Sequence, residues 1–303
     1  MSRYESAILK SVIYASLFDY PLTLEQLHQT LIATTMTREQ ILATYDNSVR
    51  LRSVIEYRDG FFFPTGRADL IAERCEREAR SHTFIDRHRL ALRWICSLPF
   101  TRMVALSGSI AHFNLEPGGD LDLFVITGGR HVWTVTVAII VLTRLLNVRK
   151  VMCANFVMSD AHLVLPQHDL FTANQVLHLK PLIGAHVLDG FVAANPFVQR
   201  WYPNRSTRAQ LPGGFQLSRW NRLAKTIAER ILAPVSPAVE SFCRRLYARH
   251  LERRAASWRS PEQVALQLDY LKLHTRSHRQ SVLDRFDERV EEALGQGERA
   301  AIA

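Results

Sequence analysis

Two aspartates separated by one leucine carry the clearest chemical signal in this 303-residue chain. They are Asp120 and Asp122, and an apolar, strand-like run follows them. Because side chains alternate between the two faces of an extended chain, both carboxylates share one face while Leu121 and Leu123 share the other. Two adjacent like charges raise each other's pKa, and a divalent cation relieves that repulsion. We therefore expect a site for Mg²⁺ or Mn²⁺, which would bring the phosphates of a nucleotide with it.

A Gly-Ser pair lies upstream of the aspartates, at the end of another apolar run over 103–107. Gly108 would let the backbone approach a phosphate closely, and Ser109 offers an amide and a hydroxyl at the start of a short helix. His112, in the following loop, could contact a nucleotide, although a single loop histidine is more often an ordinary residue. Further candidates for phosphate contacts are Lys150, Lys180 and Arg144, although residues of this kind are more often surface charges.

The order of these parts resembles the signature of the nucleotidyltransferase superfamily, which includes polymerase β, the aminoglycoside nucleotidyltransferases and the minimal antitoxin-type enzymes. The shared pattern is an apolar strand, Gly-Ser, ten further residues after Ser109, and Asp120-x-Asp122 on a second strand. The resemblance implies a polymerase β-like core with a mixed sheet. It also implies Mg²⁺-dependent transfer of a nucleoside monophosphate from an NTP such as ATP to an acceptor, which could be a small molecule, a protein or RNA.

Members of that superfamily with a third carboxylate carry it on a neighbouring strand. In this chain the corresponding strand is expected over about 150–158, and the polar residue inside it is Asn155. An amide can bind Mg²⁺ or orient water, but it cannot act as a general base. Asp160, just beyond this strand, is the alternative third member. The expected catalytic set is therefore Asp120, Asp122 and Asn155. The alternative is a DNA-binding winged-helix regulator whose core senses nucleotide and is catalytically weak.

Local patterns indicate an α/β (α+β) chain with three regions. The first, over 1–66, is predicted to be a winged helix. A helix is expected over 3–18, capping boxes at Thr23 and Thr37 start two more, and Asp59-Gly60 centres a hairpin over 54–63. The third helix is expected to run from 37 to 52. The nucleotidyltransferase core is expected over 67–165 and a helical region over 166–303.

The remaining helices are predicted from apolar periodicity and proline positions. One or two helices are expected over 67–97, with Glu73, Arg74, Glu76 and Arg77 on a solvated surface. The apolar segment from 132 to 148 lies between two expected strands and ends in polar residues, so we expect a buried crossover helix and no membrane span. In the third region helices are expected over 172–194, 215–233, 238–257 and 261–293.

The chain is basic, with 38 Lys and Arg against 29 Asp and Glu. Thirteen Lys and Arg residues, Arg208 among them, lie between 200 and 259 together with interleaved aromatic residues. This balance favours phosphate-bearing partners. DNA binding by the winged helix and RNA binding through Arg244 and Arg245 are therefore alternatives, although arginines at helical spacing more often form a solvated face.

The four cysteines are far apart and show neither a zinc-binding nor a disulfide pattern. The N-terminal residues lack the pattern of a signal peptide. We therefore expect a reduced, cytoplasmic setting.

Overall fold

The computed structural model describes residues 1–205, 215–273 and 278–302. Its N-terminal unit combines helices with a small antiparallel sheet of strand order β1-β3-β2. Its elements are α1 (Arg3–Ser16), β1 (Leu22–Thr23), α2 (Leu24–Gln29), α3 (Arg38–Asn47), α4 (Val49–Val54), β2 (Ile55–Arg58) and β3 (Phe61–Pro64). This order of helices followed by a hairpin agrees with the sequence-based expectation.

Local signals explain where these elements begin and turn. Thr23 and Thr37 form the predicted capping boxes, and Ser2 forms a third one at the start of α1. Asp59 and Gly60 connect β2 and β3 with positive φ angles of 52° and 83°, the geometry that favours Asp-Gly in a tight hairpin. The expected helix over 37–52 is wrong in one respect. Ser48 has extended backbone, ends α3 and caps α4 through its hydroxyl, so two short helices form.

A six-stranded mixed sheet forms the centre of the molecule, with strand order β7-β4-β5-β6-β9-β8. Its strands are β4 (Thr101–Ser107), β5 (Leu121–Thr127), β6 (Met152–Ser159), β7 (Lys180–Ile183), β8 (Val264–Leu266) and β9 (Tyr270–Leu273). β5 and β6 are parallel, while the other neighbouring pairs are antiparallel. The parallel pair is joined by the crossover helix α8 (Val132–Leu145), as the sequence predicted.

Alternation along the strands sends side chains into two separate apolar clusters. Leu121, Leu123 and Val125 of β5 belong to the cluster that includes residues of α6 (Arg89–Cys96), α8 and α13 (Ser236–Arg254). Phe124 and Ile126 belong to the other cluster. That second cluster also contains residues of the N-terminal unit and of α9 (Leu170–Leu177), α10 (Ala185–Ala193) and α11 (Phe197–Trp201). The N-terminal unit therefore shares a core with one face of the sheet.

Two helices expected from the sequence are interrupted by strands. The segment over 172–194 forms α9, the edge strand β7 and α10, with Pro181 in β7 and Gly184 at φ 75° before α10. A proline is tolerated there because β7 pairs only with β4 among the described residues, as an edge strand does. The segment over 261–293 begins with a 3₁₀ turn (Pro261–Gln263) and the β8–β9 hairpin, and only then enters α14 (Arg279–Ile302). The sheet thus includes strands from both 67–165 and 166–303.

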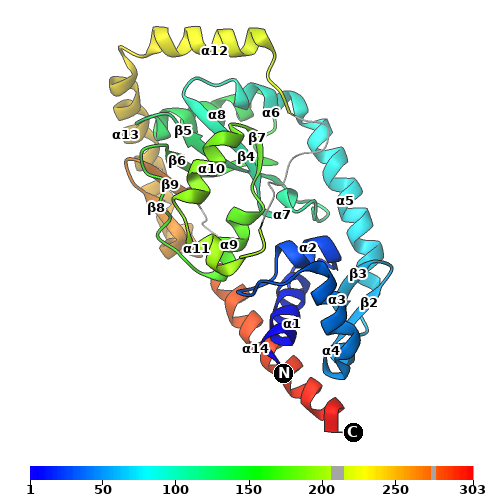
Figure 1. Ribbon diagram of the computed structural model, residues 1–303. Helices are drawn as coiled ribbons and strands as arrows, with labels where there is room; N and C mark the ends of the chain where they lie inside the picture. Colours follow the sequence, from blue (N-terminus) through cyan, green and yellow to red (C-terminus); the bar gives the residue numbers. More distant parts are fainter. Residues whose placement is uncertain (206–214, 274–277, 303) are drawn as a thin grey trace.

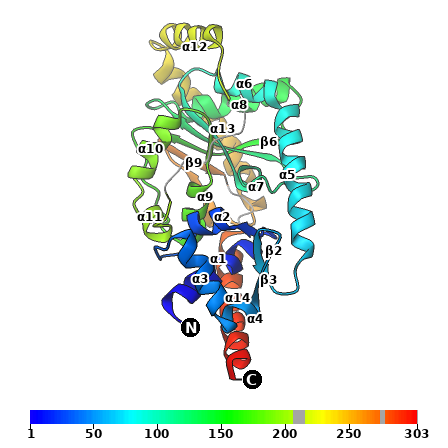
Figure 2. The same cartoon turned by 45° about the vertical axis from the view of Figure 1, so that its right-hand side comes forward.

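Three helices extend beyond the central sheet (Figure 1). α5 (Asp69–Arg87) runs along one side from the N-terminal unit to α6, and α12 (Arg219–Leu232) lies at the opposite end of the molecule (Figure 2). α14 returns to the N-terminal unit, where it packs against α1 and α4. On α5 the expectation of a uniformly solvated surface is wrong, because Arg74 and Arg77 are each only 6% exposed. Both guanidinium groups contact the N-terminal unit.

Of the helices in the described ranges, none combines the length and apolar character that crossing a bilayer requires. The most apolar one, α8, places Val132, Trp133 and Ile139 in the core and has Val141 and Leu145 exposed. It is a crossover helix at the surface of the sheet.

Candidate active site

The carboxylate pair lies at the beginning of β5. Asp120 immediately precedes the strand, and Asp122 lies opposite Ser107 of β4 and Cys153 of β6. Leu121 and Leu123 are fully buried in the cluster on the other face of the sheet. The alternation of the strand therefore places the two carboxylates together on the face that the N-terminal unit approaches.

Gly108 lies directly against Asp122. Its φ is +66°, and a Cβ atom at this position would lie 2.7 Å from Oδ2 of Asp122. Any larger residue would therefore meet the carboxylate as well as the unfavourable backbone geometry. Ser109 is exposed in α7 (Gly108–Ala111). Because α7 has only four residues, it offers individual amide groups and not the dipole of a long helix.

Asn155 is brought to Asp122 by an irregularity in β6. The β5–β6 register shifts between Leu123 and Phe124, so Asn155 is an extra residue between Ala154 and Phe156. Such bulges change the direction of a side chain within a strand. The Nδ2 group of Asn155 donates a hydrogen bond to Oδ1 of Asp122. Asn155 thus orients the carboxylate of Asp122, which belongs to the same predicted catalytic set.

The two carboxylates lie in an environment that disfavours their charge. Burial, together with the neighbouring charge of Asp120, raises the pKa of Asp122 to about 7. Burial also raises the pKa of Asp120. Neither forms an ion pair with a Lys, Arg or His of the described residues. A half-buried carboxylate pair without a protein cation fits a divalent metal ion, although the described ranges contain no group of three or more His, Cys, Asp or Glu residues placed to hold one.

Three other residues predicted from the sequence, Asp160, Lys150 and Lys180, lie away from the carboxylate pair. Asp160 lies at the opposite end of β6, where its Oδ1 accepts a hydrogen bond of 2.8 Å from the amide of Gly129, so it does not complete the carboxylate pair. Lys150 is exposed in the turn before β6 and does not line the cavity beside the aspartates. Lys180 is buried at the start of β7, where its ammonium lies 4.5 Å from the ring centre of Phe113.

A cavity of about 710 Å³ opens in front of the carboxylates. One wall comes from the sheet and the loop after β4, and it includes Gly108, Ser109, Asp120, Asp122 and Asn155. The opposite wall comes from the N-terminal unit, with further residues from α9 and α14. In Figure 1, α9 and the start of α14 lie where the sheet meets the N-terminal unit. The volume is within the range of small-molecule sites.

His112 also lines this cavity, stacked against His178 of the segment after α9. The ring centres are 3.9 Å apart. Burial and the nearby charge of Lys180 lower the pKa of His178 to about 3, and burial together with His178 lowers the pKa of His112 as well. The pair is therefore uncharged at neutral pH, and His112 offers the cavity a neutral ring.

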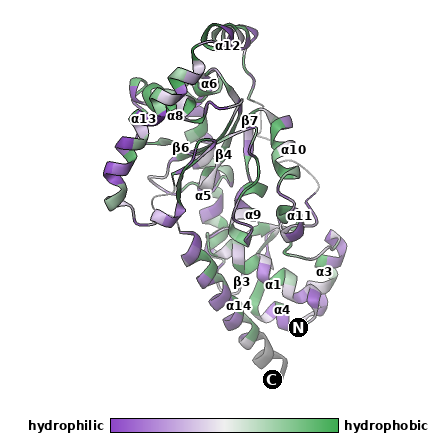
Figure 3. Ribbon diagram, turned by 90° about the vertical axis from the view of Figure 1, so that its left-hand side faces the viewer, coloured by the Kyte–Doolittle hydropathy of each residue, from purple (hydrophilic) through white to green (hydrophobic). Residues whose placement is uncertain are grey.

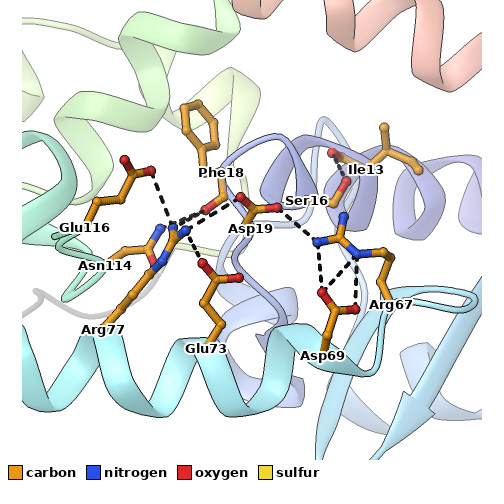
Figure 4. A network of polar contacts seen from close by, with 10 residues as sticks. All are labelled: Ile13, Ser16, Phe18, Asp19, Arg67, Asp69, Glu73, Arg77, Asn114 and Glu116. Atoms are coloured by element: carbon orange, nitrogen blue, oxygen red, sulfur yellow. Dashed lines mark hydrogen bonds and ion pairs between the residues drawn. The ribbon is translucent and has the colours of Figure 1, made fainter.

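A polar network fixes the N-terminal unit against the loop that follows α7 (Figure 4). The buried guanidinium of Arg77 donates to the carbonyl of Phe18 at 3.4 Å and lies 3.6 Å from Asp19 and 3.7 Å from Glu116. Asn114 donates its Nδ2 to the same carbonyl at 2.8 Å. These contacts hold both walls of the cavity in one arrangement.

Two buried polar atoms in this cavity have no hydrogen-bond partner among the described residues. They are the hydroxyl of Tyr14, on α1, and Oδ1 of Asn114. A buried polar atom without a partner costs free energy unless a bound molecule or water satisfies it. Both the N-terminal unit, through Tyr14, and the loop after α7, through Asn114, therefore present to the cavity a polar atom that a polar ligand would satisfy.

Sequence reasoning missed several residues of this cavity. Cys153 could have been found, because it lies two residues before Asn155 on the same strand. Tyr14, Asn114 and His178 carry no local signal, since they reach the cavity only through the docking of distant elements.

Comparisons of the chain with protein-family models, with curated proteins and with solved structures found no match.

Proposed function

We propose that the protein is a metal-dependent nucleotidyltransferase with Asp120 and Asp122 as its metal-binding carboxylates. The observation that carries the proposal is the convergence of this pair with Gly108 and Asn155 on one wall of a cavity of about 710 Å³. The proposed fold assignment is a polymerase β-like core built on β4, β5 and β6. The runner-up role is a catalytically weak nucleotide sensor with the same site.

In the proposed reaction an acceptor hydroxyl oxygen bonds to the α-phosphorus of an NTP. The bond from that phosphorus to the bridging oxygen breaks, pyrophosphate leaves, and the hydroxyl proton passes to water. When bound, Mg²⁺ would neutralise phosphate charge and lower the pKa of the attacking hydroxyl. Asp120 and Asp122 would hold the ion, Asn155 would orient Asp122, and the absent side chain of Gly108 would leave room for the phosphates.

Groups on both walls of the cavity support a nucleoside as the second part of the ligand. The unpartnered oxygen of Asn114 can accept a hydrogen bond, and the hydroxyl of Tyr14 can donate one. The neutral ring of His112 adds a surface for stacking. These groups suit a polar aromatic base better than they suit a second anionic group.

The N-terminal unit has the element order of a winged helix, and we propose that its role is to complete the nucleotide cavity. Its α1 and the following turn line that cavity. On α3, Arg38 is paired with Glu25, and Glu39 and Asp46 are exposed. This mixed charge gives little attraction for a DNA backbone.

The test is a transfer assay with α-labelled ATP, GTP, CTP and UTP, Mg²⁺ or Mn²⁺, and small-molecule, protein and RNA acceptors. We expect labelled product or labelled protein in the wild type and none with Asp122→Ala. The proposal fails if no nucleotide binds at millimolar concentration and the Asp122→Ala variant behaves like the wild type.

A further inference from the structure

A second cavity, of about 330 Å³, begins on the far side of Cys153 and Asn155. These two residues and Leu273 line both cavities. The other walls come from α8, from the turn before β6 and from α13. Figure 3 shows α13 beside α8 and β6, with many hydrophilic residues along α13. The second cavity therefore adjoins the carboxylate cavity at these shared residues.

Three arginines from three different segments line this second cavity. They are Arg144 in the last turn of α8, Arg149 before β6 and Arg254 in the last turn of α13. In the part of the chain that the structure describes, none of the three forms an ion pair with a carboxylate. Their charges are uncompensated by protein groups at a concave surface.

Arg149 is held in position by its neighbours. Its Nη1 donates to the carbonyl of Met152 at 3.3 Å and contacts Sγ of Cys153 at 3.0 Å. The rest of the planar guanidinium remains free to bind a second group. A cation fixed before binding loses less entropy when a ligand arrives.

The positive charges of all three arginines act on the side chain of Tyr247, on α13. Burial raises the pKa of Tyr247, while the charges of Arg149, Arg144 and Arg254 act in the opposite direction. Tyr247 also stacks with His250, whose ring centre is 6.0 Å away. Trp258 adds a second aromatic surface to the cavity. Positive charge and aromatic surface are thus combined in a space the size of a small metabolite.

We propose that the second cavity binds the phosphate group of a small phosphorylated molecule that serves as the acceptor. Guanidinium groups bind the oxygens of phosphates and of carboxylates in pairs, and three of them match the charge of about −2 of a phosphate monoester better than the single charge of a carboxylate. The volume of about 330 Å³ suits a small molecule, and the shared Cys153 and Asn155 give it a short path to Asp122. The acceptor role rests on the proposed function, whereas phosphate binding in this cavity does not. The terminal phosphates of the NTP have the same chemistry as the phosphate of such an acceptor, so the experiment compares Mg²⁺-ATP with a phosphorylated small molecule.

The test measures the Kd of glycerol 3-phosphate, of inorganic phosphate and of Mg²⁺-ATP by calorimetry. The variant carries Arg149→Gln and Arg254→Gln, and the matched control carries Arg244→Gln and Arg245→Gln, which are exposed on α13 and do not line the cavity. We expect the Kd of glycerol 3-phosphate to rise by about tenfold per arginine in the first variant only. Arg254→Glu alone, at an exposed position, gives the same test without risk to folding.

A loss for glycerol 3-phosphate alone supports an acceptor site. A parallel loss for Mg²⁺-ATP supports a phosphate site that holds the end of the NTP and overturns the acceptor role. Equal effects of both double variants, no effect of either, or no binding of phosphate and glycerol 3-phosphate by the wild type at 10 mM overturns the phosphate site. Asp122→Asn separates the two proposals, because it should abolish Mg²⁺-dependent ATP binding and leave glycerol 3-phosphate binding unchanged.

Discussion

Asp122 is the residue on which the proposed chemistry depends. It is the more buried of the two carboxylates, it receives a hydrogen bond from Asn155, and its neighbour Gly108 can hold no side chain. Asn155 fixes the position of Asp122 but adds no negative charge. In the proposed reaction, such a site would offer two carboxylates to a metal ion and leave removal of the acceptor's proton to solvent.

The contact between Gly108 and Asp122 leads to a prediction for Gly108→Ala. The substitution should lower the free energy of unfolding by more than the roughly 1–2 kcal/mol expected for a left-handed backbone position, because the new methyl group meets Oδ2 of Asp122. Urea denaturation measures it. Gly118→Ala is the matched control, since its φ is +78° and no atom lies within 4 Å of the added carbon. Equal losses in the two variants would show that the carboxylate contact has no cost.

The stacked histidines predict a pH dependence of stability. In the unfolded chain a histidine takes up a proton near pH 6.5, whereas His178 in the folded protein does so only near pH 3. The unfolded state therefore binds more protons between these values, so stability is greatest above pH 6.5 and falls as the pH is lowered toward 3.

We expect His178→Phe to reduce the slope of unfolding free energy against pH between 6.5 and 4, measured by denaturant titrations at several pH values. The variant should start less stable at pH 7.5, because His178 Nδ1 donates a hydrogen bond of 2.9 Å to the carbonyl of Asn174. His186→Phe, at an exposed position, should keep the wild-type slope. An unchanged slope in His178→Phe would contradict the neutral pair.

At the scale of elements, the N-terminus of α8 is capped by a carboxylate from another helix. Glu240 of α13 accepts hydrogen bonds from the amides of Trp133 and Thr134 at 2.9 and 2.8 Å, and from the hydroxyl of Thr134 at 2.6 Å. A negative charge at this end also complements the helix dipole. This contact joins α13 to α8, and the two helices together form the arginine-lined cavity.

Glu240→Ala should therefore lower the free energy of unfolding by about 2 kcal/mol. Chemical denaturation measures the loss, and Glu252→Ala, an exposed glutamate on the same helix, is the control with little expected change. The capping role would be wrong if both variants had the same stability.

Elements defined by local chemistry could be predicted from the sequence, and those defined by distant pairing could not. Capping boxes at Thr23 and Thr37 and the Asp59-Gly60 turn act within a few residues, and they are observed. β7 becomes a strand because β4 offers it an edge, which lies about 75 residues earlier in the chain. β8 and β9 have only three and four residues, and burial does not alternate along either strand, so no period of two distinguished them from helix-forming residues.

In the candidate site, too, features set by local chemistry could be predicted and those set by distant contacts could not. The shared face of Asp120 and Asp122 follows from the alternation of a strand, so the sequence alone predicts it. The contact of Asn155 with Asp122 depends on the parallel register and a bulge, neither of which has a local signal. The buried positions of Arg74 and Arg77 likewise depend on where the N-terminal unit docks.

At the scale of the whole molecule, the cavity exists because the two ends of the chain meet. α14 packs on α1 and α4, and Phe286 of α14 lies edge-on to Tyr14 with ring centres 5.4 Å apart. Arg77 fixes the N-terminal unit to the loop that precedes β5. A ligand between these walls would contact both the N-terminal unit and the sheet, so its binding should stabilise the folded chain as a whole.

The central claim is that Asp120 and Asp122 bind a metal ion together with an NTP. The most direct measurement is calorimetric titration of ATP, GTP, CTP and UTP into the protein with Mn²⁺ and with EDTA, for the wild type and Asp122→Asn. We predict that at least one NTP binds with Mn²⁺, that EDTA weakens this binding by tenfold or more, and that Asp122→Asn removes the metal dependence. NTP binding that is unaffected by EDTA and by Asp122→Asn, or no binding of any NTP at millimolar concentration, would contradict the account.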